Sequence, residues 1–185
     1  MRLIYITFIS LLLSACTSTV NFDYDRAVNF NSFTTYTINK EPVRVTGDTR
    51  INSPFMTKRV VAELNITLAN KGFEKSNEKA ELEVNYFLDI KPELETEDSG
   101  FVSLGFGASR RHSAVGLGFN IPIGEVSNID KLVLTIDFVS VKTKKLIWRG
   151  SLGYHLYEGA TPETYTTLVK KLVAEILKNF PPNNK

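Results

Sequence analysis

Hydrophobic and polar residues alternate along several stretches of the chain with a period of two. This is the period of a strand that turns one face to a core and the other to solvent. The alternation, or a short extended pattern, covers residues 20–25, 34–38, 80–90, 132–139 and 146–154. Residues 141–145 between the last two stretches are polar and turn-forming, so we expect those two strands to pair as a hairpin.

Two other segments repeat apolar residues at the spacing of an amphipathic helix. They open on Ser53-Pro54 and Thr161-Pro162, each a capping residue followed by a proline whose missing N–H costs nothing at the first helical position. The first segment ends at Lys71-Gly72 and the second before Pro181-Pro182, which are typical helix stops. We therefore expect two helices, each with one apolar face to bury.

A glycine-rich stretch, residues 100–124, holds six of the eleven glycines. Apolar residues keep one parity on its first arm and the other on its second, which predicts a hairpin that folds back around residues 109–113. Glycine also weakens strands, so an insertion without strands is the alternative interpretation. The residues that would give this hairpin an apolar face and a basic tip, and so a partner-binding surface, are Phe106, Arg110, Arg111 and Phe119.

The order of these elements predicts an α+β domain. Two amphipathic helices need a common apolar surface, and a sheet with one apolar face provides it. We expect a two-layer sandwich, with an antiparallel sheet of about five to seven strands and both helices packed on one face. This single domain would cover residues 20–182, followed by a polar tail at 183–185.

The N-terminus carries Arg2 and then an apolar run over residues 3–13. A helix of about 11 residues rises about 16 Å, roughly half the hydrocarbon thickness of a bilayer, so this run suits a signal peptide better than a membrane span. It ends in Leu13-Ser14-Ala15-Cys16, which resembles the lipobox of bacterial lipoproteins. An ordinary secretory signal with a chance cysteine is the alternative.

The lipobox resemblance implies an address and an anchor. Signal peptidase would recognise Leu13, Ser14 and Ala15 and remove residues 1–15, and Cys16 would carry the lipid. Because Thr17 rather than an aspartate follows the cysteine, similarity to enterobacterial lipoproteins implies sorting to the inner leaflet of the outer membrane, facing the periplasm, in a Gram-negative bacterium. Residues 16–19 would form a short tether.

Composition and charge narrow the function. The chain is 43% hydrophobic and 23% charged, as in folded globular domains. The formal net charge is only +2 and no basic stripe is present, so nucleic acid is not an expected partner. The single cysteine would be lipidated, which leaves no thiol for a disulfide.

The residues offer little for catalysis. His112 and His155 are the only histidines, and a zinc site needs about four ligands. No Gly-x-Ser-x-Gly elbow and no phosphate loop occur in the sequence, and the acidic run at 93–98 lacks the turn glycine of a calcium loop. We therefore expect no catalytic residue, metal or cofactor, and not an enzyme.

Two residue pairs have alternative interpretations. Asp23 and Asp25 share one strand face and form either a carboxylate pair or two solvent-facing side chains. Alternation places Trp148 toward the core and Arg149 on the opposite face, where it would pair with an acid on a neighbouring strand. A ligand site at Trp148 and Arg149 is the alternative.

Several short motifs together resemble the bacterial lipoproteins grouped as domain of unknown function 4136, over the whole mature chain. The motifs are the lipobox, Phe22-Asp23-Tyr24-Asp25, Phe33-Thr34-Thr35-Tyr36, Lys71-Gly72-Phe73, Ala80-Glu81-Leu82-Glu83-Val84, Leu146-Ile147-Trp148-Arg149-Gly150 and Phe180-Pro181-Pro182. The resemblance implies a periplasm-facing envelope lipoprotein without an established activity, and it carries over no catalytic residues.

Two functional hypotheses remain. The first is a non-catalytic envelope component that is held at the membrane by the lipid on Cys16 and binds a protein or lipid partner through the glycine-rich hairpin, since large exposed apolar patches mark interaction sites. The second is a carrier module in which helices and sheet part to admit a small apolar ligand or lipid. A hydrolase is a distant third.

Overall fold

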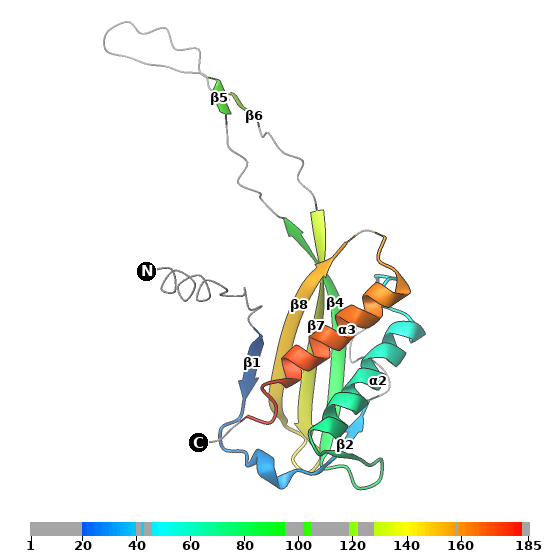
Figure 1. Cartoon of the computed structure of the whole chain (residues 1–185). Helices are drawn as coiled ribbons and strands as arrows, with labels where there is room; N and C mark the ends of the chain where they lie inside the picture. The colour runs from blue at the N-terminus through cyan, green and yellow to red at the C-terminus, as the bar shows by residue number, and fades with distance from the viewer. Residues whose placement is uncertain are drawn as a thin grey trace, which may run out of the picture.

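The computed structural model describes residues 20–39, 42, 46–94, 102–104, 119–121, 128–157 and 159–182. Within these residues two helices cover one face of an open sheet (Figure 1). The elements in chain order are β1 (Asn21–Tyr24), η2 (Phe30–Ser32), β2 (Thr35–Ile38), α2 (Pro54–Asn70), β3 (Glu74–Lys75), β4 (Leu82–Leu94), β5 (Val102–Leu104), β6 (Phe119–Ile121), β7 (Asn128–Ser140), β8 (Leu146–Leu156) and α3 (Pro162–Leu177).

The main sheet has six strands in the order β1-β8-β7-β4-β2-β3. The pairs β1–β8, β8–β7 and β7–β4 are antiparallel, whereas β2 is parallel to both β4 and β3. The predicted α+β class and its two layers are confirmed, but the sheet is mixed rather than purely antiparallel. The reason is that the chain leaves β2 through α2 and returns beside it, and such a crossover leaves the strands parallel.

Both helices begin at their predicted caps. The Ser53 hydroxyl accepts the Met56 N–H at 3.3 Å, and the Thr161 hydroxyl accepts the Thr164 N–H at 3.3 Å, so each satisfies one of the unpaired donors of the first turn. Gly72 follows α2 with φ of 86°, the left-handed conformation that glycine adopts without steric cost. Both predicted helix starts and the end of the first helix are thus confirmed, whereas the second helix ends at Leu177, before the predicted stop at Pro181-Pro182.

The core lies between the two helices and the sheet and centres on Trp148, which is fully buried. Phe180 stacks on Phe138 with ring centroids 3.7 Å apart and meets Trp148 edge to face at 5.3 Å. Gly150 makes this packing possible, because a Cβ there would lie 2.9 Å from Trp148 Cζ3 and 2.7 Å from Ile176 Cγ2. The predicted inward orientation of Trp148 is confirmed.

No helix formed by the described residues covers the opposite face of the sheet, and we call it the helix-free face. It is formed by the alternate residues of β4, β7 and β8 that include Asn85, Asp137 and Arg149, which lie directly opposite one another across the three strands. At the edge, β1 pairs with β8 and with no other strand among the described residues. Its alternation predicted a half-buried strand, but Phe22 is 45% exposed, because an edge strand has a neighbour on one side only.

Candidate functional site

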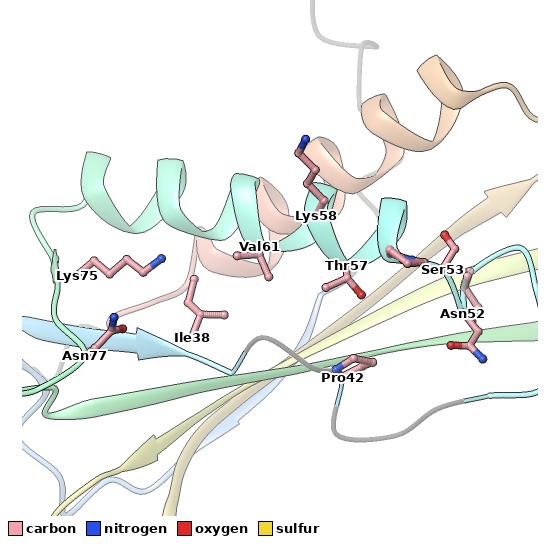
Figure 2. A pocket seen from close by; sticks show the side chains of 11 residues that line it. Ile38, Pro42, Asn52, Ser53, Thr57, Lys58, Val61, Lys75 and Asn77 are labelled. Atoms are coloured by element: carbon pink, nitrogen blue, oxygen red, sulfur yellow. The ribbon is translucent and has the colours of Figure 1, made fainter.

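A pocket of about 630 Å³ lies between α2 and the end of β2. Figure 2 shows it below the first turns of α2, with side chains contributed by the strand, the helix and the segments that flank them. We call it the α2–β2 pocket. Its lining residues are Ile38, Pro42, Ile51, Asn52, Ser53, Pro54, Thr57, Lys58, Val61, Lys75 and Asn77.

The pocket combines apolar walls with one lysine ammonium that extends along it. The side chains of Ile38 on β2 and Val61 on α2 point toward each other (Figure 2). The Lys75 ammonium, from β3, extends along the pocket below α2, whereas the Lys58 ammonium points away from the sheet (Figure 2). The pocket therefore presents apolar surface and a positive charge to the same occupant.

An ion-pair cluster fixes the wall that precedes α2. Arg50 binds Asp48 at 2.6 Å and also Asp130 at the start of β7. These hydrogen bonds raise the pKa of Arg50, and the bond to Arg50 holds the pKa of Asp48 below its usual range. The adjacent Ile51 is only 5% exposed. The segment that forms this wall is therefore held by an ion pair to β7 and by the buried Ile51 side chain.

The inner end of the pocket approaches the core. A small cavity of about 20 Å³ shares Pro42, Ile51, Asn52 and Thr57 with the pocket and reaches Tyr86 and Leu88 of β4. These two residues belong to the buried core. The pocket thus leads from the surface toward the interface between sheet and helices.

The helix-free face contains the ion pair that alternation predicted. Arg149 donates to both carboxylate oxygens of Asp137 on the neighbouring strand, at 2.7 and 2.6 Å. Its guanidinium also lies over the Phe87 ring, 5.8 Å from the centroid. Asp137 is only 8% exposed, and its hydrogen bond raises the pKa of Arg149. The arrangement joins three strands, and these contacts fit the structural interpretation of Arg149.

Glu81 ties the start of β4 to the segment that enters β2. Its carboxylate accepts hydrogen bonds from the N–H groups of Thr34 at 2.8 Å and Thr35 at 3.2 Å, and these bonds lower the pKa of Glu81. No local pattern predicts this contact, because its partners lie 46 and 47 residues away along the chain.

Most residues of the predicted functional sites lie outside the described residues. These are Leu13, Ser14, Ala15, Cys16, Phe106, Arg110 and Arg111. Phe119 begins β6 and lies opposite Leu104 of β5 in an antiparallel pair. Because nothing in the structure tests the partner-binding surface at these residues, it stays a prediction.

The Asp23 and Asp25 side chains serve local backbone hydrogen bonds. Asp23 accepts from the N–H of Tyr24 and Asp25 from the N–H of Ala27, each at 2.9 Å. Both residues are exposed. The solvent-facing interpretation fits these contacts. Among the described residues no group of three or more His, Cys, Asp or Glu side chains could hold a metal ion, and no helix in this part of the chain has the length and apolarity to cross a membrane.

A family model described as a domain of unknown function, DUF4136, matches residues 20–182. The chain belongs to the DUF4136 family. No curated protein sequence matches it. The family assignment agrees with the motifs quoted above and adds no activity, since the family is defined without one.

Solved structures resemble this DUF4136 chain in fold. A PDZ domain protein from Parabacteroides distasonis matches with a TM-score of 0.55 and 12% identity, over 90% of this chain and 36% of that one. This chain therefore spans little more than a third of that protein's length. A PelC dodecamer from Paraburkholderia phytofirmans matches with a TM-score of 0.46 and 9% identity, over 87% of this chain and 96% of that one. At such identities the likeness concerns the fold alone.

Proposed function

We propose that this protein is a lipid-anchored binding protein of the bacterial envelope. The lipid on Cys16 holds it in the inner leaflet of the outer membrane, facing the periplasm. The α2–β2 pocket then holds a small amphipathic molecule with an apolar body and an acidic group. In this proposal the protein carries or senses its ligand and does not transform it.

The α2–β2 pocket is the observation that carries the proposal. Its volume of about 630 Å³ lies within the range of roughly 300–1,000 Å³ for small-molecule sites. Ile38 and Val61 offer apolar contact on opposite sides, and Lys75 supplies one cation along the same space (Figure 2). An ammonium favours a carboxylate or phosphate group through a charge-assisted hydrogen bond, which gives the acidic end of the ligand a fixed position.

The polar groups of the pocket suit binding. The Ser53 hydroxyl caps α2 by accepting the Met56 N–H, and a nucleophilic hydroxyl needs an adjacent base. The described lining residues include no carboxylate and no imidazole. Asn52, Thr57 and Asn77 can instead hydrogen-bond to a ligand, as polar groups do in binding pockets.

Native mass spectrometry of the protein purified from its own host tests this function. We expect a co-purifying acidic amphiphile, bound one to one. Lys75→Glu should release it, because the variant places a negative charge against the acidic group, whereas Lys58→Glu should retain it, because that ammonium points away. The same charge change at two residues of one pocket makes the pair a matched control.

A second pair of variants tests the location of the site. Val61→Trp should fill the pocket and abolish co-purification, and Ile66→Trp should have no effect, because Ile66 lies on the same helix but is 54% exposed and does not line the pocket. Absence of any co-purifying molecule, or equal retention in Val61→Trp and Ile66→Trp, would contradict the proposed pocket.

The anchor is tested separately. Cys16→Ala should move the protein from the membrane fraction to the soluble fraction of the host envelope, because the variant lacks the thiol that accepts the lipid. Equal membrane retention of the variant would contradict anchoring through Cys16, and it would leave the pocket experiment unaffected.

A further inference from the structure

The backbone of β2 turns alternately to its two neighbours as it approaches the α2–β2 pocket. Successive residues of a strand direct their N–H and C=O groups to opposite edges. The Tyr36 carbonyl accepts the Ser76 N–H at 2.8 Å, on the β3 edge, whereas the Asn39 N–H donates to the Val84 carbonyl of β4 at 3.0 Å. The N–H and C=O groups of Ile38 therefore point to the β3 edge.

β3 ends before it reaches Ile38. Tyr36 with Lys75 is the last pair of the β2–β3 ladder, and the chain then turns, with the Ser76 hydroxyl accepting the Lys79 N–H at 3.1 Å. No described residue forms a backbone hydrogen bond with Ile38 on this edge. Ile38 lines the pocket, so one backbone donor and one acceptor are open there. An extended chain can satisfy both by adding a strand to the sheet.

The pocket also holds a lysine that needs an acidic partner. Lys75 lies opposite the buried Tyr36 on the helix side of the sheet, whereas the preceding Glu74 belongs to the other side. Neither Lys75 nor Lys58 forms an ion pair with a described residue. Glu78, the next acid along the chain, does not line the pocket. A ligand can therefore supply the missing carboxylate.

The position of Lys75 selects the direction of an added strand. β3 occupies the edge at the start of β2, and the edge is open at the other end, at Ile38. A chain that pairs with Ile38 antiparallel to β2 runs toward the end of β3, and only a terminus or a turn fits there. A C-terminal carboxylate would meet Lys75 in a charge-assisted hydrogen bond. A parallel chain would instead bring an N-terminal ammonium to the same lysine, and like charges repel.

The apolar walls of the pocket fit a side chain of the same strand. The Ile38 and Val61 side chains point toward each other, and the Lys75 ammonium extends along the space beside them (Figure 2). Every second side chain of an added strand points to the helix side of the sheet, where these walls lie. An aliphatic side chain at or near the C-terminus of the ligand would contact both walls.

We propose that the α2–β2 pocket binds the C-terminal end of an extended peptide, which pairs with Ile38, places an aliphatic side chain against Val61 and gives its carboxylate to Lys75. The inference rests on the proposed function of the pocket and narrows its ligand class to peptides with a free, apolar C-terminus. Strand addition and capture of a terminal carboxylate are two general modes of peptide recognition, and the pocket offers the groups for both.

A peptide array tests this ligand class. Hexapeptides with five random residues and a last residue of valine, leucine or isoleucine are made twice, with a free carboxylate and with an amide, and are screened against the mature protein in detergent. We expect binders among the free acids, and amidation should raise their Kd about ten-fold or more, because it removes one charged hydrogen bond. Lys75→Gln should abolish this difference, and Lys58→Gln should preserve it.

N-methylation of a binding peptide tests the strand pairing. One amide near the C-terminus should tolerate no methyl group, with a loss of about five-fold or more, because it donates to the Ile38 carbonyl. Its two neighbours should tolerate methylation, because their N–H groups point away from β2. Equal affinity of acid and amide, equal effects of Lys75→Gln and Lys58→Gln, or indifference to every methyl group would overturn the inference.

Failure of this inference differs from failure of the pocket. If no peptide of the array binds, while a non-peptide acid co-purifies and is released by Lys75→Glu, the peptide is overturned and the proposed function stands. If no peptide binds and no molecule co-purifies, both are overturned.

Discussion

Gly150 and Gly153 lie on the same strand but face opposite sides of the sheet, and replacing each by alanine should have very different effects. The Gly150 position faces Trp148 and Ile176, both of which are fully buried. The Gly153 position faces Val133 and the stem of Lys131 on the helix-free face, where both residues are partly exposed. Comparing the two alanine variants therefore separates the cost of overpacking the core from the effect of alanine on strand conformation.

The cost of Gly150→Ala follows from these contacts. The methyl group would stand 2.7 Å from Ile176 Cγ2 and 2.9 Å from Trp148 Cζ3, inside van der Waals contact, and the Trp148 ring is held in turn by Phe138 and Phe180. Overpacking of a filled core costs about 1–3 kcal/mol, and a rigid ring on one side favours the upper value of about 3. Reduced chain entropy in the unfolded state returns about 0.4–1 kcal/mol.

The expected net loss is thus about 2 kcal/mol, or roughly 4–8 °C in melting temperature for a domain of this size. Gly153→Ala should cost less than about 1 kcal/mol, since the Lys131 side chain can move into solvent. Thermal and urea unfolding of the purified protein, followed by circular dichroism, measures both. The packing argument is refuted if Gly150→Ala is as stable as wild type or if the two variants lose the same stability.

Three further results are expected. The pKa of the Glu81 carboxylate is lowered, so the carboxylate stabilises the fold above its ordinary pKa of 4.5 and loses this effect as the pH falls below that value. The difference in unfolding free energy between wild type and Glu81→Gln should therefore shrink between pH 5 and pH 3. A constant difference in urea unfolding would contradict this. Arg50→Met should lower the free energy of unfolding by less than about 1 kcal/mol, because surface ion pairs contribute little. It should nevertheless speed hydrogen exchange at residues 48–53. Unchanged exchange there would argue against the bridge to Asp130. Arg149→Met should lower the free energy of unfolding by about 3 kcal/mol, because it leaves the buried Asp137 carboxylate without its partner. Asp137→Asn should lower it by only about 1 kcal/mol, because the Arg149 side chain is 50% exposed. The reverse order in urea unfolding would refute this asymmetry.

Local pattern predicted the elements because local chemistry determines them. The caps at Ser53 and Thr161 act on N–H groups three residues away, and the alternation through Trp148 and Arg149 fixes which side chain is buried. These signals lie within a few residues of their effects. The two helices, the long strands and the outward orientation of Arg149 were therefore accessible from the sequence.

Strand direction and the pocket were not accessible in this way. Alternation is the same for parallel and antiparallel strands, so the parallel pairing of β2 with β4 left no trace in it. The α2–β2 pocket is lined by residues from separate segments, among them Ile38, Val61 and Lys75. No local sequence motif marks any of these three residues.

The domain closes on its own two ends, and this has a consequence for folding. β1 pairs with β8, and Phe30 meets Phe180 edge to face at a centroid distance of 6.1 Å. β1 and Phe30 are synthesised long before their partners, and contacts so distant in sequence form slowly. These contacts, and with them the closed domain, therefore form only after α3 and Phe180 have been synthesised.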